Sequence, residues 1–144
     1  MKFRNCEKHD IDLVKNILSE ENLPYSDIEK IVDCIFIVEN EDGSLVGIAA
    51  LETYGKVALL RSLVIKKSER NKSYGSLILT HIEKIGAKRR IEEIYLLTES
   101  AEMYFSHHGF EEILRNIVPA EIRNSSQFSS LCPSSAKVMR KYIV

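Results

Sequence analysis

A short polar segment between two apolar stretches carries the most specific chemistry in this sequence. Leu63-Val64-Ile65 is typical of a buried strand, the residues from Lys66 to Ser73 are polar, and an amphipathic stretch begins near Tyr74. The first turn of a helix has backbone N–H groups without partners, and these groups bind anions with help from the helix dipole. Arg70 and Lys72 add positive charge. The pattern predicts a cradle for a pyrophosphate, and a surface turn that caps a helix is the alternative.

Other kinds of phosphate or polyanion site fit the sequence less well. The segment is not a GxxxxGK[ST] loop, and it lacks the three glycines of a dinucleotide fingerprint, which argues against nucleoside triphosphate binding. The chain has 20 Lys and Arg against 21 Asp and Glu, a formal charge of -1. A near-neutral chain has no global attraction to nucleic acid or to an anionic membrane. Any anion site must therefore be local.

Length and cysteine usage indicate the broad class of protein. The 144 residues suit one domain, and 44% hydrophobic residues are enough for a core. Cys6, Cys34 and Cys132 are odd in number and form no CxxC pair, which argues against a disulfide framework or a zinc site. No apolar run has the length of a membrane span, and the N-terminus has no apolar core of a secretion signal. We therefore expect a cytoplasmic protein with reduced thiols.

The elements that must hold the polar segment follow from periodicity and turn residues. Asp10 is a plausible N-cap for a helix that carries Ile11, Val14, Ile17 and Leu18 on one face. Ser26 to Glu29 has capping-box spacing, which predicts a second short helix. The strands expected in this half are Phe3–Cys6, Ile35–Glu39, Leu45–Tyr54 after the turn Asn40–Gly43, and Lys56–Ile65 after Gly55.

The second half of the sequence, from about Tyr74 onward, predicts a different arrangement of helices and strands. A helix begins near Tyr74, a buried strand covers Ile94–Leu97, and a helix over Ala101–His108 stops at Gly109. Phe110–Arg115 and Ala136–Ile143 are typical of late strands. The order β-α-α-β-β-β-α-β-α-β-β combines an antiparallel meander with a βαβ unit. The expected fold class is α/β (α+β), with a mixed, mostly antiparallel sheet.

The polar segment and the elements around it resemble those of the GCN5-related N-acetyltransferase (GNAT) family. The acetyl-CoA loop of that family reads [RQ]-x-x-G-x-[GA], and Arg70-x-x-Ser73-x-Gly75 matches it with serine in place of the first glycine. The segment from Leu97 to Phe110 is similar to the strand-helix-GF element that follows in the family. The resemblance implies a single N-acetyltransferase domain over residues 1–144, with helices on both sides of the central sheet.

The resemblance also implies a co-substrate, acetyl-CoA, and no metal. The backbone of Leu63, Val64 and Ile65 would pair with the pantetheine arm, and an N–H of Leu63 or Val64 would polarise the thioester carbonyl. The residues expected around the rest of the cofactor are Arg70, Asn71, Lys72, Ser73, Tyr74, Gly75 and Ser76 at the pyrophosphate, and Thr98, Ala101, Tyr104 and Phe105 on the other side. A neutral amine would attack the acetyl thioester within a ternary complex.

One position departs from many family members. They place a tyrosine four residues before the glycine of GF, where it protonates the leaving thiolate; here that position is Phe105. Tyr104 is adjacent, but one helical step is about 100° of rotation, so we expect it to point elsewhere. The thiol has a pKa of about 8.5, so its thiolate can leave without strong acid help. No acid role is therefore assigned to either residue.

The C-terminal part resembles a subgroup, the arsenic-resistance N-acetyltransferases, which are relatives of enzymes that acetylate amino-acid α-amines. The resemblance rests on Val118–Arg123, Gln127-Phe128 and Leu131–Ala136. It implies an acceptor similar to arsinothricin, phosphinothricin or glutamate, and a homodimer is plausible from the family and the exposed late strands. Such an acceptor carries a carboxylate, for which Arg61 is the first candidate clamp and Arg123 the second.

The remaining candidate residues have two interpretations each. Arg61 is otherwise an exposed strand arginine, and Gln127, Phe128 and Ser125 either close over the acceptor or form a packed surface loop. Glu52 is either the base that takes the ammonium proton or a solvated carboxylate, with Glu99 as a second choice.

The other groups with reactive side chains fit structural roles better. We expect His81 to pack in the core, and His107-His108 to lie at the surface or cap a helix. Cys132 would need a base to act as a nucleophile, and none is identifiable. A small-molecule amine is the expected partner, and neither nucleic acid nor a membrane is expected.

Two further functions remain open on the sequence. Ser73 and Phe105 are compatible with a catalytically weak acyl-CoA-binding regulatory module. Acetylation of protein N-termini or lysines is the other alternative. The long segment Pro119–Pro133 favours a covered pocket over the open groove that a protein acceptor needs.

Overall fold

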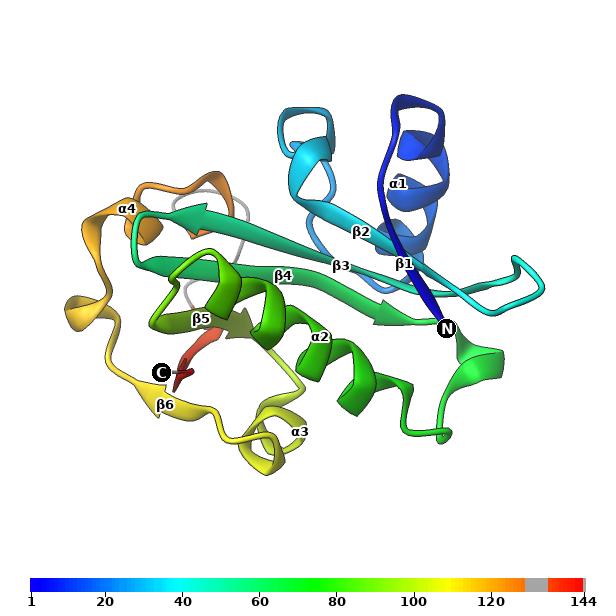
Figure 1. Cartoon of the computed structure of the whole chain (residues 1–144). Helices are drawn as coiled ribbons and strands as arrows, with labels where there is room; N and C mark the ends of the chain where they lie inside the picture. Colours follow the sequence, from blue (N-terminus) through cyan, green and yellow to red (C-terminus); the bar gives the residue numbers. More distant parts are fainter. Residues whose placement is uncertain (129–134, 144) are drawn as a thin grey trace. The chain divides into compact units, whose positions relative to one another are not determined.

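The computed structural model describes residues 1–128 and 135–143 of the chain. It contains a seven-stranded sheet with the order β1-β2-β3-β4-β5-β7-β6. β4 and β5 are parallel, whereas β1–β2, β2–β3, β5–β7 and β6–β7 are antiparallel. Figure 1 follows the chain through these strands and the helices between them. The predicted fold class, a mixed and mostly antiparallel sheet with helices, is confirmed.

The described chain divides into two compact units. The first consists of Met1–Glu52 and Arg61–Thr80, and the second of Thr53–Leu60 and the described residues from His81 onward. β3 (Leu45–Tyr54), β4 (Val57–Ile65) and α2 (Tyr74–Lys88) each run from one unit into the other.

The first unit is built around an amphipathic helix on a hairpin. Its other elements are β1 (Lys2–Asn5), η1 (Lys8–Asp10), α1 (Ile11–Glu20), η2 (Ile28–Lys30), η3 (Val32–Cys34), β2 (Ile35–Glu39) and η4 (Lys67–Glu69). Val14 and Leu18 of α1 are fully buried with Ile35 and Ile37 of β2 and Ile48 of β3. Burying aliphatic side chains of this size stabilises a fold by about 1.5–3 kcal/mol each. The helical spacing read from the sequence therefore identifies this core.

The hairpin of β2 and β3 has the bounds predicted from the sequence. The amide of Asn40 donates to the Ser44 carbonyl at 2.8 Å, and that of Gly43 donates to the Asn40 carbonyl at 2.9 Å. Gly43 has φ of 85°, a conformation that suits glycine. The register shifts between Val38 and Glu39, which marks a β-bulge next to the turn.

Two capping predictions in this unit are wrong in detail. Asp10 precedes α1, but its carboxylate accepts a hydrogen bond from the backbone of Glu7 instead of capping α1. The capping box predicted over Ser26 to Glu29 does not form, because η2 begins at Ile28 after Asp27, and the Asp27 carboxylate binds Arg61 instead of a helix amide. Only the single turns η2 and η3 form where the sequence predicts a second helix. In both cases a cation elsewhere in the chain binds the carboxylate, which a local pattern does not reveal.

The second unit holds the C-terminal strands. Its elements besides the shared ones are β5 (Glu93–Thr98), α3 (Glu102–His107), β6 (Glu111–Ile113), η5 (Arg115–Ile117), α4 (Ala120–Arg123) and β7 (Lys137–Tyr142). Leu59 of β4, Tyr95 of β5 and Val138 of β7 are buried together with Val118 and Ile122. The chain between β6 and β7 thus contributes to this core through its short helical turns. Among the described residues, no helix is long and apolar enough to cross a membrane.

Candidate functional site

The end of β4 changes direction just before the residues predicted to bind the pantetheine. β4 pairs with β5 through Val57, Ala58 and Leu59, and this register assigns no β5 partner to Leu63, Val64 or Ile65. Ser62, between the two parts, has φ of 60°, which interrupts the extended conformation. On the β3 side the strand stays attached, because the amide of Lys66 donates to the Val46 carbonyl at 2.8 Å.

The loop from β4 to α2, which Figure 1 shows as a ribbon, presents a series of backbone amides. In the described residues, the amides from Asn71 to Ser76 have no acceptor, whereas the next one, that of Leu77, donates to the Ser73 carbonyl at 3.3 Å. Asn71 and Ser73 both have φ of 64°. Alternation between left-handed and other conformations turns successive N–H groups toward one concave side, and such concavities bind anions. The loop can therefore receive a pyrophosphate through its backbone.

The two cations of the loop have partners within the protein. The guanidinium of Arg70 donates from Nε to the Ile65 carbonyl at 2.9 Å and from Nη2 to Glu21 at 2.7 Å. Lys72 pairs with Glu69 at 3.0 Å. Both are exposed pairs, and such pairs exchange readily with other anions because each is worth about 1 kcal/mol or less. Arg70 thereby ties the loop to the end of β4.

A buried ionic cluster lies on β3, β4 and the segment before η2. Arg61 donates from Nη1 and Nη2 to the two carboxylate oxygens of Asp27 at 2.6 and 2.8 Å. Its Nη1 also donates to Oε2 of Glu52 at 3.2 Å. Only 3% of Arg61 and 6% of Glu52 are exposed. The alternatives of an exposed strand arginine and a solvated carboxylate are therefore wrong.

The charge state of Arg61 is fixed by these partners. Burial alone would lower its pKa, but the hydrogen bonds and charges of Asp27 and Glu52 outweigh burial and raise the pKa above the usual value. Direct contact between Arg61 and an acceptor carboxylate stays a prediction. Such a clamp would require Asp27 to release its two hydrogen bonds. The sequence gives no sign of the role of Asp27, because 34 residues separate it from Arg61 and it lies inside a segment with capping-box spacing.

In the second unit, α3 carries the other predicted cofactor residues. Thr98 accepts a hydrogen bond at its Oγ1 from the amide of Ala101 at 2.9 Å, which fixes the start of α3. Phe105 is buried edge-to-face on Phe110, with ring centroids 5.7 Å apart, whereas 40% of Tyr104 is exposed. Partial burial raises the pKa of Tyr104. The two neighbouring rings thus point in different directions, as expected, and Phe105 has no proton to donate.

The predicted acceptor residues near α4 have different surroundings. Arg123 is exposed on α4, whereas Gln127 is 4% exposed and its Oε1 has no partner among the described residues. Phe128 is half-buried, and the guanidinium carbon of Arg115 lies 5.1 Å from its ring centroid. Their contact with an acceptor stays a prediction. Cys132 and most of the predicted segment Leu131–Ala136 lie outside the described residues.

The histidines and the second candidate base have peripheral positions. His81 is partly buried, and burial lowers its pKa, with Lys84 and Lys88 acting in the same direction. His107 and Glu99 are exposed. His108 lies against Tyr104, with ring centroids 4.7 Å apart. These positions agree with a surface or capping role for His107 and His108, whereas His81 is only partly buried instead of lying in the core as expected.

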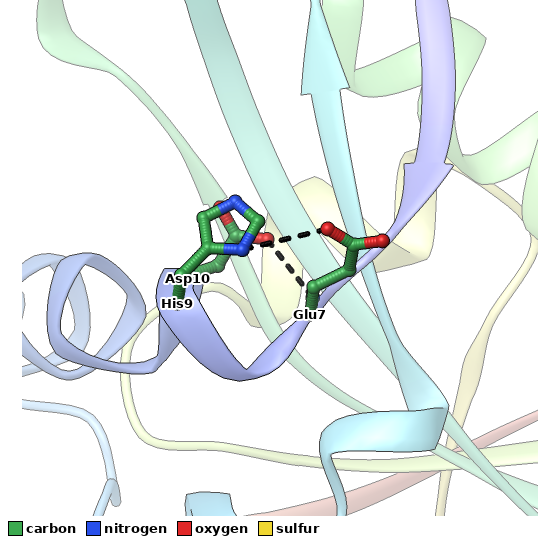
Figure 2. A group of neighbouring side chains, drawn as sticks. All are labelled: Glu7, His9 and Asp10. Atoms are coloured by element: carbon green, nitrogen blue, oxygen red, sulfur yellow. Dashed lines mark hydrogen bonds and ion pairs between the residues drawn. The ribbon is translucent and has the colours of Figure 1, made fainter.

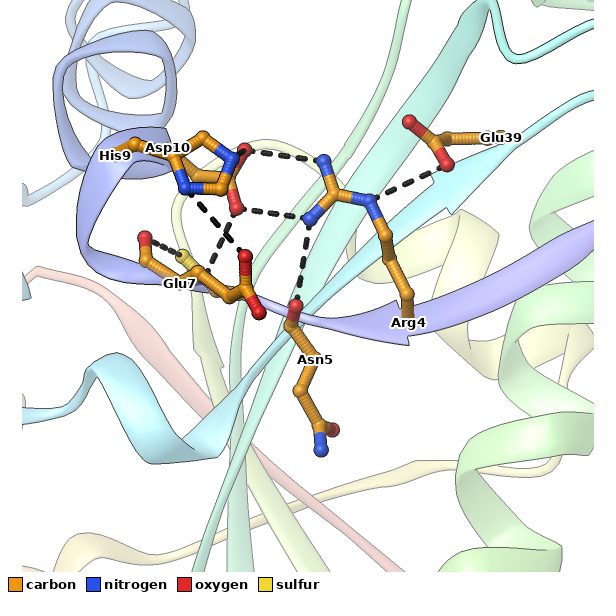
Figure 3. A network of polar contacts seen from close by, with 7 residues as sticks. Arg4, Asn5, Glu7, His9, Asp10 and Glu39 are labelled. Carbon is orange, nitrogen blue, oxygen red and sulfur yellow. Dashed lines mark hydrogen bonds and ion pairs between the residues drawn. The ribbon is translucent and has the colours of Figure 1, made fainter.

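One group of side chains has the composition of a metal site. Glu7, His9 and Asp10 present ligand atoms within 4.8 Å of one another (Figure 2). Figure 3 shows that Asp10 faces Arg4, whose Nη1 and Nη2 donate to its two oxygens at 2.8 and 3.0 Å. This guanidinium lowers the pKa of Asp10 to about 2. The buried member of the group therefore already has a cation, and the other two are exposed.

Relatives with related sequences are N-acetyltransferases. The chain is 30% identical over 98 residues to an uncharacterized N-acetyltransferase of Chlorobaculum tepidum, a match that covers 66% of this chain and 63% of the relative. It is 28% identical over 88 residues to an amino-acid acetyltransferase of Vibrio atlanticus, covering 60% of this chain and 20% of that protein. The matches thus span less than two thirds of either relative.

Solved structures show the same fold at lower identity. An N-acetylglutamate synthase from Neisseria gonorrhoeae, complexed with coenzyme A and N-acetyl-glutamate, superimposes with a TM-score of 0.83 at 18% identity, over 99% of this chain and 35% of that chain. Tetrahymena GCN5 gives 0.78 at 19% identity, over 100% of this chain and 97% of that chain. The model of the acetyltransferase (GNAT) family matches residues 7–110. With this match over more than half of its length, the chain belongs to the GNAT family of acetyltransferases.

Proposed function

We propose that the chain is an acetyl-CoA-dependent N-acetyltransferase that acts on the amine of a small, amino-acid-like acceptor, and that residues 1–144 work as one domain. The observation that carries the proposal is the series of partnerless amides from Asn71 to Ser76 at the start of α2, in a GNAT-family chain. These amides would hold the pyrophosphate of acetyl-CoA. Arg70 would keep the loop in place through its bond to the Ile65 carbonyl.

The residues of β4 would position the thioester. The edge of Leu63, Val64 and Ile65 has no partner in β5, so its backbone groups can pair with the pantetheine arm. An N–H of Leu63 or Val64 would donate to the thioester oxygen as negative charge develops on it. Acetyl-CoA would supply the activated acetyl group, and the residues of the chain would remove the proton from the acceptor amine.

Glu52 is the proposed base. It would take a proton from the acceptor ammonium, directly or through a water molecule, so that the free amine forms the new N–C bond as the C–S bond breaks. The nitrogen loses its second proton as the amide forms, and the leaving thiolate would take this proton through solvent, because Phe105 offers none. Thr98, Ala101, Tyr104 and Phe105 are proposed to contact the cofactor, and Arg61, Arg123, Gln127 and Phe128 the acceptor.

The proposal extends to the identity of the acceptor and to the cellular role of the protein. The Neisseria enzyme was solved with coenzyme A and an N-acetylated amino acid. This neighbour supports an α-amino acid as acceptor, and the resemblance of Val118–Arg123 to arsenic-resistance enzymes supports a glutamate-like compound such as arsinothricin or phosphinothricin. A role in arsenic resistance, a cytoplasmic location and a homodimer are parts of the same proposal.

An amine panel tests the proposal. Acetyl-CoA is supplied with free amino acids, phosphinothricin, arsinothricin and short peptides, and release of the free thiol is measured. We expect turnover of one or more amino acids and little turnover of peptides. Turnover of peptides alone would assign the chain to protein acetylation. Binding of acetyl-CoA without turnover of any amine would assign it to the regulatory acyl-CoA-binding class.

A further inference from the structure

We propose that Asp27 is a positioning residue for Glu52 and that it acts through Arg61. The inference rests on the proposed function, in which Glu52 takes the proton of the acceptor amine. Asp27 lies in the segment before η2, which no sequence motif connects with the chemistry. Its connection with Glu52 consists only of contacts within the first unit of the chain.

The contacts form a chain of hydrogen bonds with one shared donor. Both oxygens of Asp27 accept from Arg61, at 2.6 Å from Nη1 and 2.8 Å from Nη2. The same Nη1 donates to Oε2 of Glu52 at 3.2 Å. The side chain of Arg61 is 0% exposed, and those of Asp27 and Glu52 are 6% and 8% exposed. Water therefore has little access with which to replace any of these bonds.

The geometry of a guanidinium explains why Asp27 controls the orientation. The five N–H donors of arginine lie in one plane, so two parallel bonds to a carboxylate fix the direction of every other donor. With Asp27 in place, Nη1 is held where it reaches Glu52. Without that carboxylate, Arg61 keeps a long flexible stem and one strong partner, and it can turn Glu52 away from the acceptor.

A second anchor for Arg61 comes from the same segment. The carbonyl of Pro24 lies 3.5 Å from Nη2 of Arg61, at the limit of a hydrogen bond. Arg61 thus joins β4 and β3 to the segment between Pro24 and Asp27. Asp27 contributes the stronger, charged part of this connection, and its replacement by asparagine removes the charge with little change in shape.

The chain offers a matched control in the pair of Arg4 and Asp10. Asp10 is also buried, 4% exposed, and also accepts two parallel hydrogen bonds from one arginine, at 2.8 and 3.0 Å (Figure 3). This pair joins β1 to the start of α1, whereas Glu52 and Arg61 belong to β3 and β4. Asp10→Asn therefore removes a comparable buried carboxylate from the same unit without touching the proposed base.

A double-mutant cycle tests the inference. The kcat for thiol release at saturating acetyl-CoA is measured for the wild type, Asp27→Asn, Glu52→Gln and the double variant, with the amino acid that the amine panel identifies. We expect kcat to fall about 100-fold in Glu52→Gln and about 10-fold in Asp27→Asn. In the Glu52→Gln background, Asp27→Asn should cause no further loss, because it has no base left to position.

The controls separate positioning from a general loss of structure. Asp10→Asn should keep kcat within about twofold of the wild type while it lowers the melting temperature as much as Asp27→Asn does. The dissociation constant of acetyl-CoA, from calorimetry, should stay within about twofold in all variants.

The outcomes distinguish this inference from the proposed function. An equal drop in kcat from Asp27→Asn in both backgrounds, or no drop in either, would overturn the positioning role and leave the acetyltransferase standing. No effect of Glu52→Gln would overturn both the base and its positioning. A wild type that acetylates no amine would overturn the proposed function itself, and the inference with it.

Discussion

Ser73 occupies a backbone conformation that suits glycine, the residue the GNAT loop has at this position. Its φ is 64°, and a residue with a side chain is strained there by about 1 kcal/mol. We expect Ser73→Gly to bind acetyl-CoA as tightly as the wild type or up to about fivefold more tightly, since glycine adopts this loop conformation without the strain. Ser73→Val, with its branched side chain, should bind at least about tenfold more weakly. Calorimetry measures both.

Arg90 provides the control for this prediction. It also has a positive φ, 62°, and follows α2 in the second unit. Arg90→Gly should relieve the same backbone strain and Arg90→Val should increase it, but both should leave acetyl-CoA affinity unchanged. Equal affinity losses in Ser73→Val and Arg90→Val would contradict a specific role of the loop.

Asp10 predicts how the stability of the chain depends on pH. Its pKa is lowered to about 2 by the hydrogen bonds of Arg4, from the usual value of 3.8. A lowered carboxyl pKa stabilises the folded state fully above the unfolded value, and this contribution disappears as pH falls toward the folded value. In urea unfolding at pH 7, Asp10→Asn should be less stable than the wild type by about 1–2 kcal/mol. The difference should shrink between pH 4 and 2, and a difference that stays constant there would contradict the ion pair.

At the scale of elements, β3 and β4 come close together at Gly47. A methyl group on Gly47 would overlap the carbonyl oxygen of Val64, which belongs to the backbone and cannot turn aside. We expect Gly47→Ala to lower the free energy of unfolding by about 2–3 kcal/mol, as overpacking does. It should also weaken acetyl-CoA binding, because it displaces the strand proposed to pair with the pantetheine.

Gly86 of α2 is the matched control for this change. A methyl group there would meet the Cδ1 atom of Ile143 at 2.9 Å, and that atom ends a flexible side chain. Helix propensity favours alanine over glycine by about 1 kcal/mol, which offsets the contact. Chemical denaturation should therefore find Gly86→Ala within about 0.5 kcal/mol of the wild type. Similar losses in both variants would show that Gly47 is not special.

The elements differ in how well the sequence predicts them. β2 and β3 have the predicted bounds because a turn of Asn40–Gly43 separates two strongly apolar runs, a local signal. The start of α2 at Tyr74 was predictable for the same reason. The cluster of Asp27, Arg61 and Glu52 was not, since its members come from distant segments. Local patterns showed Arg61 as a strand arginine and Glu52 as a strand carboxylate, and they gave Asp27 no role of its own.

At the scale of the whole molecule, the two units carry different parts of the predicted residue set. The first holds the amide loop, the pantetheine strand and the cluster around Glu52, and the second holds α3 and the acceptor candidates of α4. The formal charge of -1 is no guide to the anion site, because the amides of a loop contribute nothing to a charge count. The spacing of the loop residues and the geometry of their backbone predict the anion site instead.

A titration of the ¹⁵N-labelled chain with coenzyme A, followed through the backbone amide resonances, would show whether the loop binds the cofactor. The amides from Asn71 to Ser76 should show the largest shifts, with further shifts at Leu63, Val64 and Ile65, and Ser73→Val should need at least about tenfold more coenzyme A to reach the loop shifts. Saturating coenzyme A that leaves the amides from Asn71 to Ser76 unshifted would contradict the proposed cofactor site.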